Sequence, residues 1–193
     1  MNNELRTLTT LFGYGEDALT LWAITERLDL ILEELGDDSD PEYVFYRPSF
    51  GRGHYGEFDA IIITSKKAYL VESKWDGSGD LSRLEEHQIR RHKILKWFHD
   101  NWKGEVGEDW DGFARKNNLS FSEEFSRDIP SSNTILSQNI QAVLNLMIGK
   151  EIENVLLYLH RGKPTGIDTD FKIVELEYET IYGNFIELLS KRG

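Results

Sequence analysis

The fold of this chain is decided by the stretch Gly56-Glu-Phe-Asp-Ala-Ile-Ile-Ile-Thr-Ser-Lys-Lys-Ala-Tyr-Leu-Val-Glu-Ser-Lys74. Two apolar runs, residues 60–64 and 68–71, lie on either side of a Ser-Lys-Lys turn. Short runs that are rich in β-branched and aromatic residues and bounded by polar residues are typical of strands. The stretch therefore predicts a β-hairpin.

Charged side chains stand at one end of both strands of this hairpin. Because successive side chains of a strand point to opposite faces, Asp59 shares a face with Ile61. By the same alternation, Leu70, Glu72 and Lys74 share a face of the second strand. The apolar hairpin is thus predicted to end in two carboxylates and an ammonium group.

The composition limits the class of protein. A length of 193 residues suits one domain with a substantial core, so a single domain over 1–193 is expected. The absence of cysteine excludes disulfides and thiolate metal sites, and it fits a reducing compartment. The first residues lack the features of a signal peptide and no run approaches a membrane span. We expect a soluble, intracellular and cytoplasmic protein with no membrane partner.

The net charge of −12 works against nonspecific attraction to nucleic acid, which depends on clustered Lys and Arg. The charge is uneven along the chain, because the stretch from Arg83 to Lys103, with both ends included, contains six Lys and Arg residues while 37–42 and 105–111 are acidic. A local basic surface is one interpretation of the basic run, and the solvated face of an amphipathic helix is the other.

Hydrophobic periodicity and turn residues predict the remaining elements. They are a helix over 17–35, a strand over 43–46, a glycine-rich loop over 48–56, a helix over 81–102, a buried helix over 134–148 that stops at Gly149, strands over 155–159 and 171–178, and a last helix over 181–189. Residues 104–132 are polar and are expected to form an insertion or lid with a short helix around 110–115.

The order of these elements predicts the topology. The first three strands are expected to pair as a meander, and the long helical crossover after Lys74 predicts a parallel neighbour for the second hairpin strand. The predicted fold class is therefore α/β, with a mixed β-sheet flanked by helices and an αβββαβ core.

Two loops contain basic residues that are candidates for substrate contacts. Arg52 and His54 lie in the glycine-rich loop. Arg161 and Lys163 lie in the turn after the strand over 155–159, where a phosphate contact and a plain turn are both open.

Asp59, Glu72 and Lys74 suit the hydrolysis of a phosphodiester. That reaction needs a cation that neutralises the phosphate, a positioned water and stabilisation of the developing charge. The two carboxylates are hard oxygen donors suited to Mg²⁺ or Mn²⁺, and the carbonyl of Ser73 is a candidate third ligand. Lys74 shares the face of Glu72 and is expected to orient or help to deprotonate the attacking water.

An Asp that begins one strand and a Glu-Ser-Lys that ends the next, with a helix before and after, resembles the PD-(D/E)XK nuclease superfamily, which has the restriction-endonuclease-like fold. The resemblance covers residues 16–103, and the Gly-Glu-Phe-Asp approach is similar to the Mrr-like and archaeal resolvase-like branches. It implies that Asp59 and Glu72 are metal ligands and that Lys74 is catalytic. The proline of the family name is replaced here by Phe58.

The same resemblance implies two supporting residues. Family members often add a glutamate from the first helix, for which Glu26 and Glu16 are both candidates. Several branches place a glutamine on the helix after the lysine. Gln88 stands at that place, with His92 one turn later.

A second acid-x-Lys triplet, Asp170-Phe171-Lys172, shows how specific the pattern is. It begins a predicted strand instead of ending one, and the strand before it, 155–159, contains no acid. The placement of the first triplet at a strand end therefore distinguishes it, whereas the triplet alone does not.

These observations predict a Mg²⁺- or Mn²⁺-dependent nuclease that hydrolyses DNA. The alternative, favoured by the acidic charge, is a catalytically inactive restriction-endonuclease-like module for binding or assembly. A third interpretation is an acidic protein that imitates nucleic acid. The intact trio favours the enzyme, because a decayed module is expected to lose one of the three residues. The sequence leaves open whether the protein forms a homodimer that reaches both strands of DNA.

Overall fold

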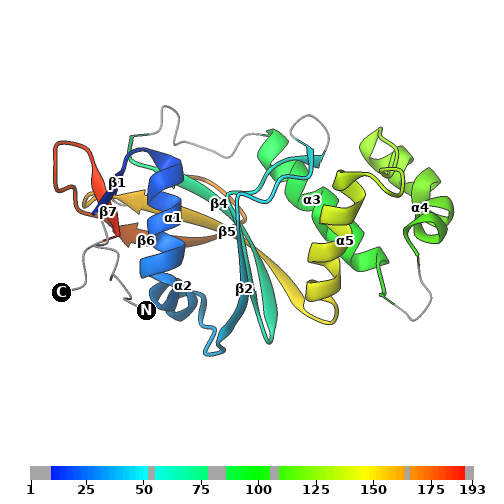
Figure 1. Ribbon diagram of the computed structural model, residues 1–193, viewed down its shortest axis with the longest axis horizontal. Helices are drawn as coiled ribbons and strands as arrows, with labels where there is room; N and C mark the ends of the chain where they lie inside the picture. The colour runs from blue at the N-terminus through cyan, green and yellow to red at the C-terminus, as the bar shows by residue number, and fades with distance from the viewer. Residues whose placement is uncertain (1–9, 52–54, 78–85, 105–108, 164–165, 190–193) are drawn as a thin grey trace, which may run out of the picture. The chain divides into compact units, whose positions relative to one another are not determined.

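A computed structural model describes residues 10–51, 55–77, 86–104, 109–163 and 166–189 (Figure 1). The chain divides into two compact units. Unit 1 consists of Met1–Asp38, Glu72–Arg83 and Val155–Gly193, and unit 2 consists of Ser39–Val71 and Leu84–Asn154. Arg52, His54 and the predicted start of a helix at Leu81 lie outside the described residues. The single domain expected from the chain length stays a prediction.

The central feature is a five-stranded mixed sheet flanked by helices, which confirms the predicted α/β class. Its strands are β2 (Pro41–Tyr46), β3 (Ala60–Thr64), β4 (Lys67–Trp75), β5 (Glu151–His160) and β6 (Lys172–Glu177), in the order β2-β3-β4-β5-β6. Strands β2, β3 and β4 form the predicted antiparallel meander, while β5 and β6 are parallel.

Strand β5 is the predicted parallel neighbour of β4. At the start of the two strands Glu151 N donates to Lys66 O, and past their ends Asp76 N donates to Leu159 O. Both strands therefore run in the same direction, as the long crossover between them predicts.

In unit 2 the predicted hairpin packs against two helices, α3 (Glu86–Asn101) and α5 (Ile135–Met147), which lie side by side (Figure 1). Ile61 pairs with Leu70 and Ile63 with Ala68, so one face of the hairpin is wholly apolar. These four residues belong to the same buried cluster as Ile94, Phe98, Ile140 and Leu144 of the helices. The α5 prediction is confirmed, with Gly149 at a φ of 73° just after its end.

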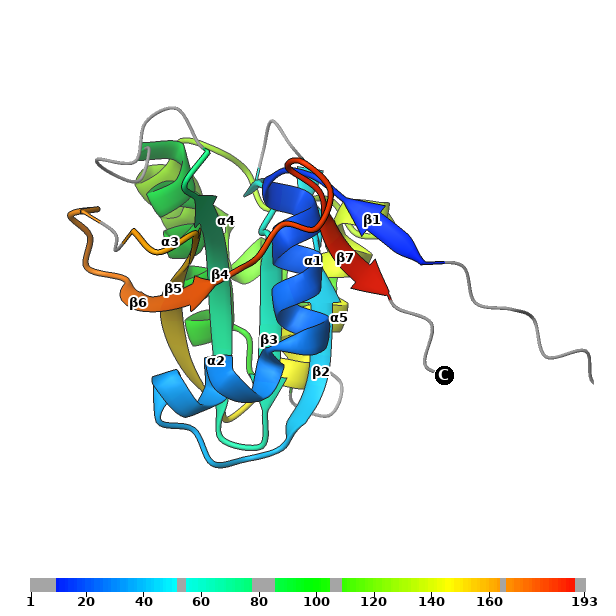
Figure 2. The same cartoon turned by 90° about the vertical axis from the view of Figure 1, so that its left-hand side faces the viewer.

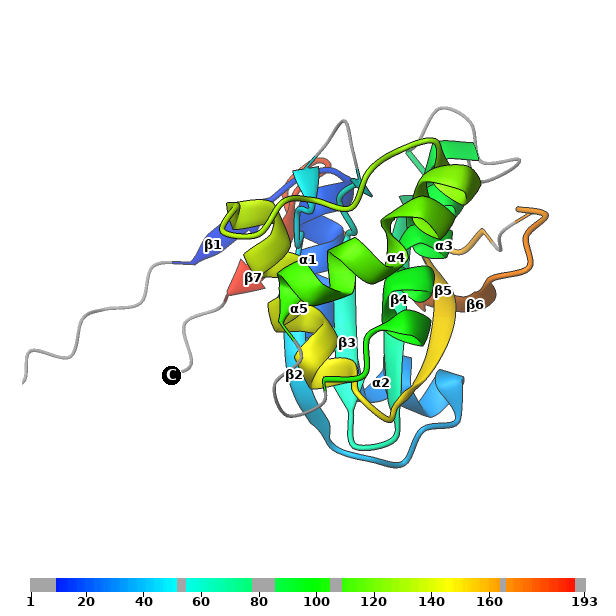
Figure 3. The same ribbon diagram turned by 90° about the vertical axis from the view of Figure 1, so that its right-hand side faces the viewer.

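Helix α4 (Trp110–Phe125) corrects the prediction of a short helix over 110–115, because it continues for 16 residues. Its buried side chains are aromatic: Trp110, Phe113, Phe121 and Phe125. The Phe121 ring lies 4.8 Å from that of Trp97 and 5.0 Å from that of Phe98, so α4 packs beside α3 (Figure 3). The polar residues between the aromatic ones occupy the exposed side of a core helix.

In unit 1 the first predicted helix is divided into α1 (Glu16–Glu26) and α2 (Leu28–Leu35). Arg27, between them, has φ −134° and ψ 16°, which is not helical. Near this break the Thr25 hydroxyl donates to Leu21 O over 2.8 Å, a back-bond that often bends helices. Helix α2 ends at Gly36, which adopts the left-handed conformation.

The predicted helix over 181–189 is wrong. Residues Ile186–Leu189 form strand β7, which pairs antiparallel with β1 (Leu11–Gly13), a strand that was not predicted (Figure 2). A turn at 182–185 precedes it, in which Phe185 N donates to Tyr182 O and Gly183 has a φ of 59°. The Gly183-Asn184 pair therefore favours a tight turn over a helix, and Ile186 is buried in the resulting ribbon.

Among the described residues no helix has the length and apolar character needed to cross a membrane.

Candidate functional site

The approach to Asp59 requires a glycine at position 56. Gly56 has a φ of +98°, and a Cβ added there would lie 2.7 Å from Cβ of Arg91 on α3. A side chain at this position would therefore be strained by both the backbone and the contact. This explains the glycine of the Gly-Glu-Phe-Asp sequence by close packing within unit 2.

Glu57 and Phe58 fix the chain before Asp59. The Glu57 carboxylate accepts a hydrogen bond of 2.8 Å from Arg47 Nε and lies 2.7 Å from the terminal amino group of the same arginine. Phe58 is fully buried, with its ring 4.9 Å from that of His92. Asp59 itself is half-buried, and its carbonyl accepts from Arg47 N. Asp59 thus lies immediately before β3, after two residues that are held by an ion pair and by burial.

Glu72, Ser73 and Lys74 form the last part of β4, within unit 1. The Glu72 side chain is 2% exposed, Ser73 is buried and Lys74 is half-buried. Strand alternation puts Glu72 and Lys74 on one face of β4, as predicted. Within the described part of the chain Lys74 makes no hydrogen bond or ion pair.

Gln88 and His92 lie one turn apart on the buried side of α3, in unit 2. His92 Nδ1 is 3.0 Å from Asn154 Oδ1, an oxygen that only accepts, so Nδ1 carries the proton. Burial lowers the pKa of His92 to about 3, an effect that the Asn154 hydrogen bond only partly opposes. His92 is therefore neutral at physiological pH.

The two candidate glutamates of the first helix differ in their surroundings. Glu26 is the last residue of α1 and is exposed. Glu16 is half-buried in the first turn of α1, where its carbonyl accepts a hydrogen bond from the Thr20 hydroxyl.

The predicted site residues belong to both units. Asp59 and Gln88 lie in unit 2, while Glu26, Glu72, Ser73 and Lys74 lie in unit 1. Within unit 1 the structure groups Glu72, Ser73 and Lys74 at one strand end. Over the described ranges, no cluster of three or more His, Asp or Glu side chains has the geometry of a metal site.

A polar cluster that the sequence does not reveal lies at the ends of the parallel strands in unit 1. Asp76 follows β4, Arg161 follows β5 and Tyr178 follows β6. The Asp76 carboxylate accepts from the Tyr178 hydroxyl over 2.6 Å and from both N and Nε of Arg161 over 3.1 Å. Burial raises the pKa of Asp76, but the hydrogen bonds from Tyr178 and Arg161 outweigh it and lower the pKa overall.

Comparison with protein-family models, with curated proteins and with solved structures finds no match to this chain.

Proposed function

We propose that the protein is a metal-dependent nuclease of the PD-(D/E)XK type that hydrolyses phosphodiester bonds in DNA. The observation that supports this most is the end of β4, where a buried carboxylate, Glu72, precedes a half-buried ammonium group, Lys74, on the same strand face. Burying charged groups costs free energy, so a buried carboxylate next to a half-buried lysine is a candidate for a functional site.

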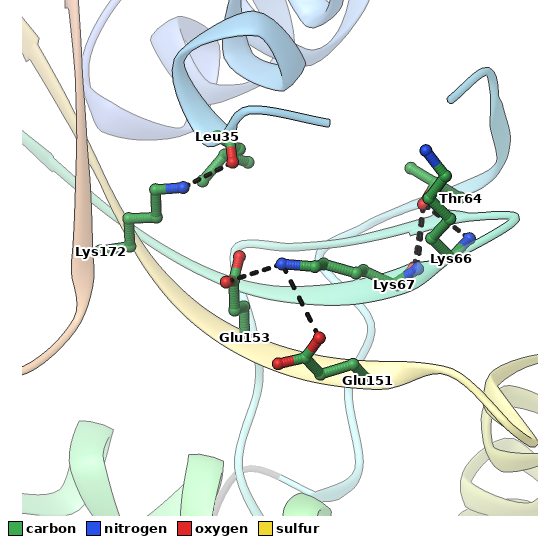
Figure 4. A network of polar contacts seen from close by, with 7 residues as sticks. All are labelled: Leu35, Thr64, Lys66, Lys67, Glu151, Glu153 and Lys172. Atoms are coloured by element: carbon green, nitrogen blue, oxygen red, sulfur yellow. Dashed lines mark hydrogen bonds and ion pairs between the residues drawn. The ribbon is translucent and has the colours of Figure 1, made fainter. Parts of the chain in front are cut away.

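The other lysines that lie in strands, Lys67 and Lys172, differ from Lys74 because each contacts another residue of the protein (Figure 4). Lys67, at the start of β4, makes a 2.9 Å ion pair with Glu153. Lys172, from the second acid-x-Lys triplet, donates to the carbonyl of Leu35 at the end of α2 over 2.5 Å. Lys74 has no such partner among the described residues, which suits a lysine that acts on a bound substrate.

The donor set fits a hard divalent cation. Asp59 and Glu72 would supply carboxylate oxygens and Ser73 a backbone carbonyl oxygen, the ligands that Mg²⁺ and Mn²⁺ prefer. When bound, such a cation would neutralise the phosphate and lower the pKa of a water molecule. Lys74 would orient that water or offset the developing negative charge, and Gln88 would support the site. Either Glu16 or Glu26 would be the additional glutamate that the first helix contributes to the site.

The test is DNA cleavage with Mg²⁺ or Mn²⁺, and then with a chelator, on linear, nicked, branched and single-stranded substrates. The variants are Asp59→Asn, Glu72→Gln and Lys74→Ala. Loss of a catalytic acid, base or metal ligand is expected to lower the rate roughly 100-fold or more. Asp170→Asn, from the second triplet, and Lys116→Ala, exposed on α4, are the matched controls and should cleave like the wild type.

The net charge of −12 favours one competing function, an inactive module that binds a partner through the same fold. Cleavage that is absent with every metal and substrate, or that survives all three substitutions, would exclude the nuclease. DNA binding that is present and unchanged in these variants would support the binding module instead.

A further inference from the structure

The parallel strands β4, β5 and β6 bring three polar side chains to one edge of the sheet in unit 1. Asp76 N donates to Leu159 O, and Tyr178 N donates to His160 O over 2.9 Å. These bonds continue the strand pairing past the strand ends and fix the backbone around the cluster. In parallel sheets the carboxyl ends of strands are the usual place for ligand contacts.

Arg161 is held in one orientation by this cluster. Its Nε donates to Asp76 Oδ2, and its guanidinium lies 5.8 Å from the centre of the Tyr178 ring. The hydroxyl of the same tyrosine anchors the other carboxylate oxygen of Asp76. The Asp76 carboxylate thus holds one edge of the guanidinium group, and the Tyr178 ring lies against one of its faces.

The outer part of the guanidinium remains available. Arg161 is 46% exposed, and in the described part of the chain its two Nη groups make no hydrogen bond. A planar guanidinium whose Nη groups face solvent can bind two oxygens of one phosphate, and a fixed side chain loses little entropy on binding.

We propose that Arg161 binds a backbone phosphate of the nucleic-acid substrate, with Asp76 and Tyr178 as its positioning residues. The proposal takes its ligand from the proposed nuclease function. Asp76 directly follows β4, and Lys74 lies two residues before it, near the end of that strand. Arg161 is hydrogen-bonded to Asp76, so both cations belong to the carboxyl ends of neighbouring strands. A chain with a net negative charge has little nonspecific electrostatic attraction to DNA. A cation that is already oriented would supply a local contact to a phosphate instead.

The competing explanation is that Arg161 only ties the ends of β4, β5 and β6 together. It predicts a loss of stability when Arg161 is replaced, with no effect on the salt dependence of DNA binding. A phosphate contact predicts a smaller slope of log K against log salt whatever the stability of the variant, because each lost contact reduces the number of released counterions.

The experiment measures binding of the full chain to a fluorescein-labelled DNA duplex by anisotropy, in chelator, over a series of salt concentrations. Arg161→Gln should weaken binding about tenfold and lower the slope of log K against log salt by about 0.9. Arg161→Lys should keep the slope but recover only part of the affinity, since it keeps the charge without the planar fork. Arg115→Gln, exposed on α4, is the control for the loss of one positive charge and should bind like the wild type.

Melting temperatures of all variants accompany the binding data. The proposal is overturned if the wild type does not bind the duplex, or if Arg161→Gln keeps the wild-type slope, whatever its melting temperature. Binding is measured without metal, so its outcome is separate from that of cleavage. If binding depends on Arg161 but no metal supports cleavage, the nuclease proposal is excluded and the phosphate contact is supported. If the protein cleaves DNA but Arg161→Gln leaves the salt slope unchanged, the phosphate contact is excluded and the nuclease proposal is supported.

Discussion

The hydroxyl of Tyr178 donates a 2.6 Å hydrogen bond to Oδ1 of Asp76 and so joins the end of β6 to the end of β4. Burial, followed by the neighbouring Asp76 carboxylate, raises the pKa of Tyr178, so the hydroxyl keeps its proton and continues to donate. The bond is charge-assisted, which is the stronger kind.

We predict that Tyr178→Phe lowers the free energy of unfolding by about 1.5–3 kcal/mol at pH 7, the usual worth of a hydrogen bond to a charged group. The pKa of Asp76 is lowered from 3.8, so its contribution is complete above that value and is lost as the pH falls through the lower folded-state pKa. The difference in the free energy of unfolding between the wild type and Tyr178→Phe should therefore become smaller below pH 4. Urea unfolding at several pH values measures it.

The control for this prediction is Tyr182→Phe, since Tyr182 is mainly exposed and its hydroxyl makes no hydrogen bond in the described ranges. It should leave the stability within about 0.5 kcal/mol of the wild type. A gap for Tyr178→Phe that stays constant down to pH 3 would contradict the role of the Asp76 charge.

His92 makes the protein sensitive to moderate acid. Its pKa is about 3 in the folded chain and 6.5 ordinarily, so the unfolded chain takes up a proton between these values while the folded chain does not. Stability is complete above pH 6.5 and falls as the pH drops, by about 1.4 kcal/mol per pH unit. His92→Gln should be less stable at pH 7 but should show a shallower loss between pH 6.5 and 4.

The matched variant is His87→Gln, on the exposed side of the same helix. It should keep the steep acid dependence of the wild type in chemical unfolding. If the free energy of unfolding falls equally steeply with pH in the wild type and in His92→Gln, the acid sensitivity does not come from His92.

Two residues of α4 test whether this helix is part of the core. Phe121 is 0% exposed and packs among the rings of α3, whereas Leu119 is 73% exposed. Phe121→Ala should cost about 3–5 kcal/mol through the cavity it leaves. Leu119→Ala, two positions away, should change the stability by less than about 0.5 kcal/mol. Similar small losses for both would indicate that α4 opens independently of the rest of unit 2.

Gly183 tests the turn before β7. Alanine at its φ of +59° is strained by about 1–2 kcal/mol, although open space surrounds the position. Gly166 also faces open space but has no positive φ, so Gly166→Ala should be neutral or slightly stabilising. Hydrogen exchange of the Ile186 amide should become faster in Gly183→Ala only. Unchanged exchange would mean that the turn does not depend on glycine.

The sequence predicts the hairpin and the parallel crossover because β-branched runs and the length of the helical connection determine them locally. It misses the length of α4, where polar residues such as Lys116 and Asn117 hide the helical spacing of Trp110, Phe113 and Phe121. That aromatic spacing was the available signal. The strand at Ile186 was missed because its partner, β1, lies at the other end of the chain.

The site shows the same difference between local and distant information. The shared face of Glu72 and Lys74 follows from alternation along one strand. The burial of Glu72 does not, because residues 68–73 of β4 are buried on both faces. The link between Asp76 and Arg161 joins residues 85 positions apart and depends on the strand order, so the turn at Arg161 offered no local sign of it. Whether Asp59 joins Glu72 in binding a metal stays a prediction.

That separation of 85 positions also matters while the chain is being made. At roughly 5–20 residues per second, the end of β4 is synthesised about 4–17 seconds before the end of β5, which pairs with its open backbone edge. During synthesis this edge is a template for pairing with other chains. We therefore expect the yield of folded protein to depend on translation speed and chaperones more strongly than its final stability suggests.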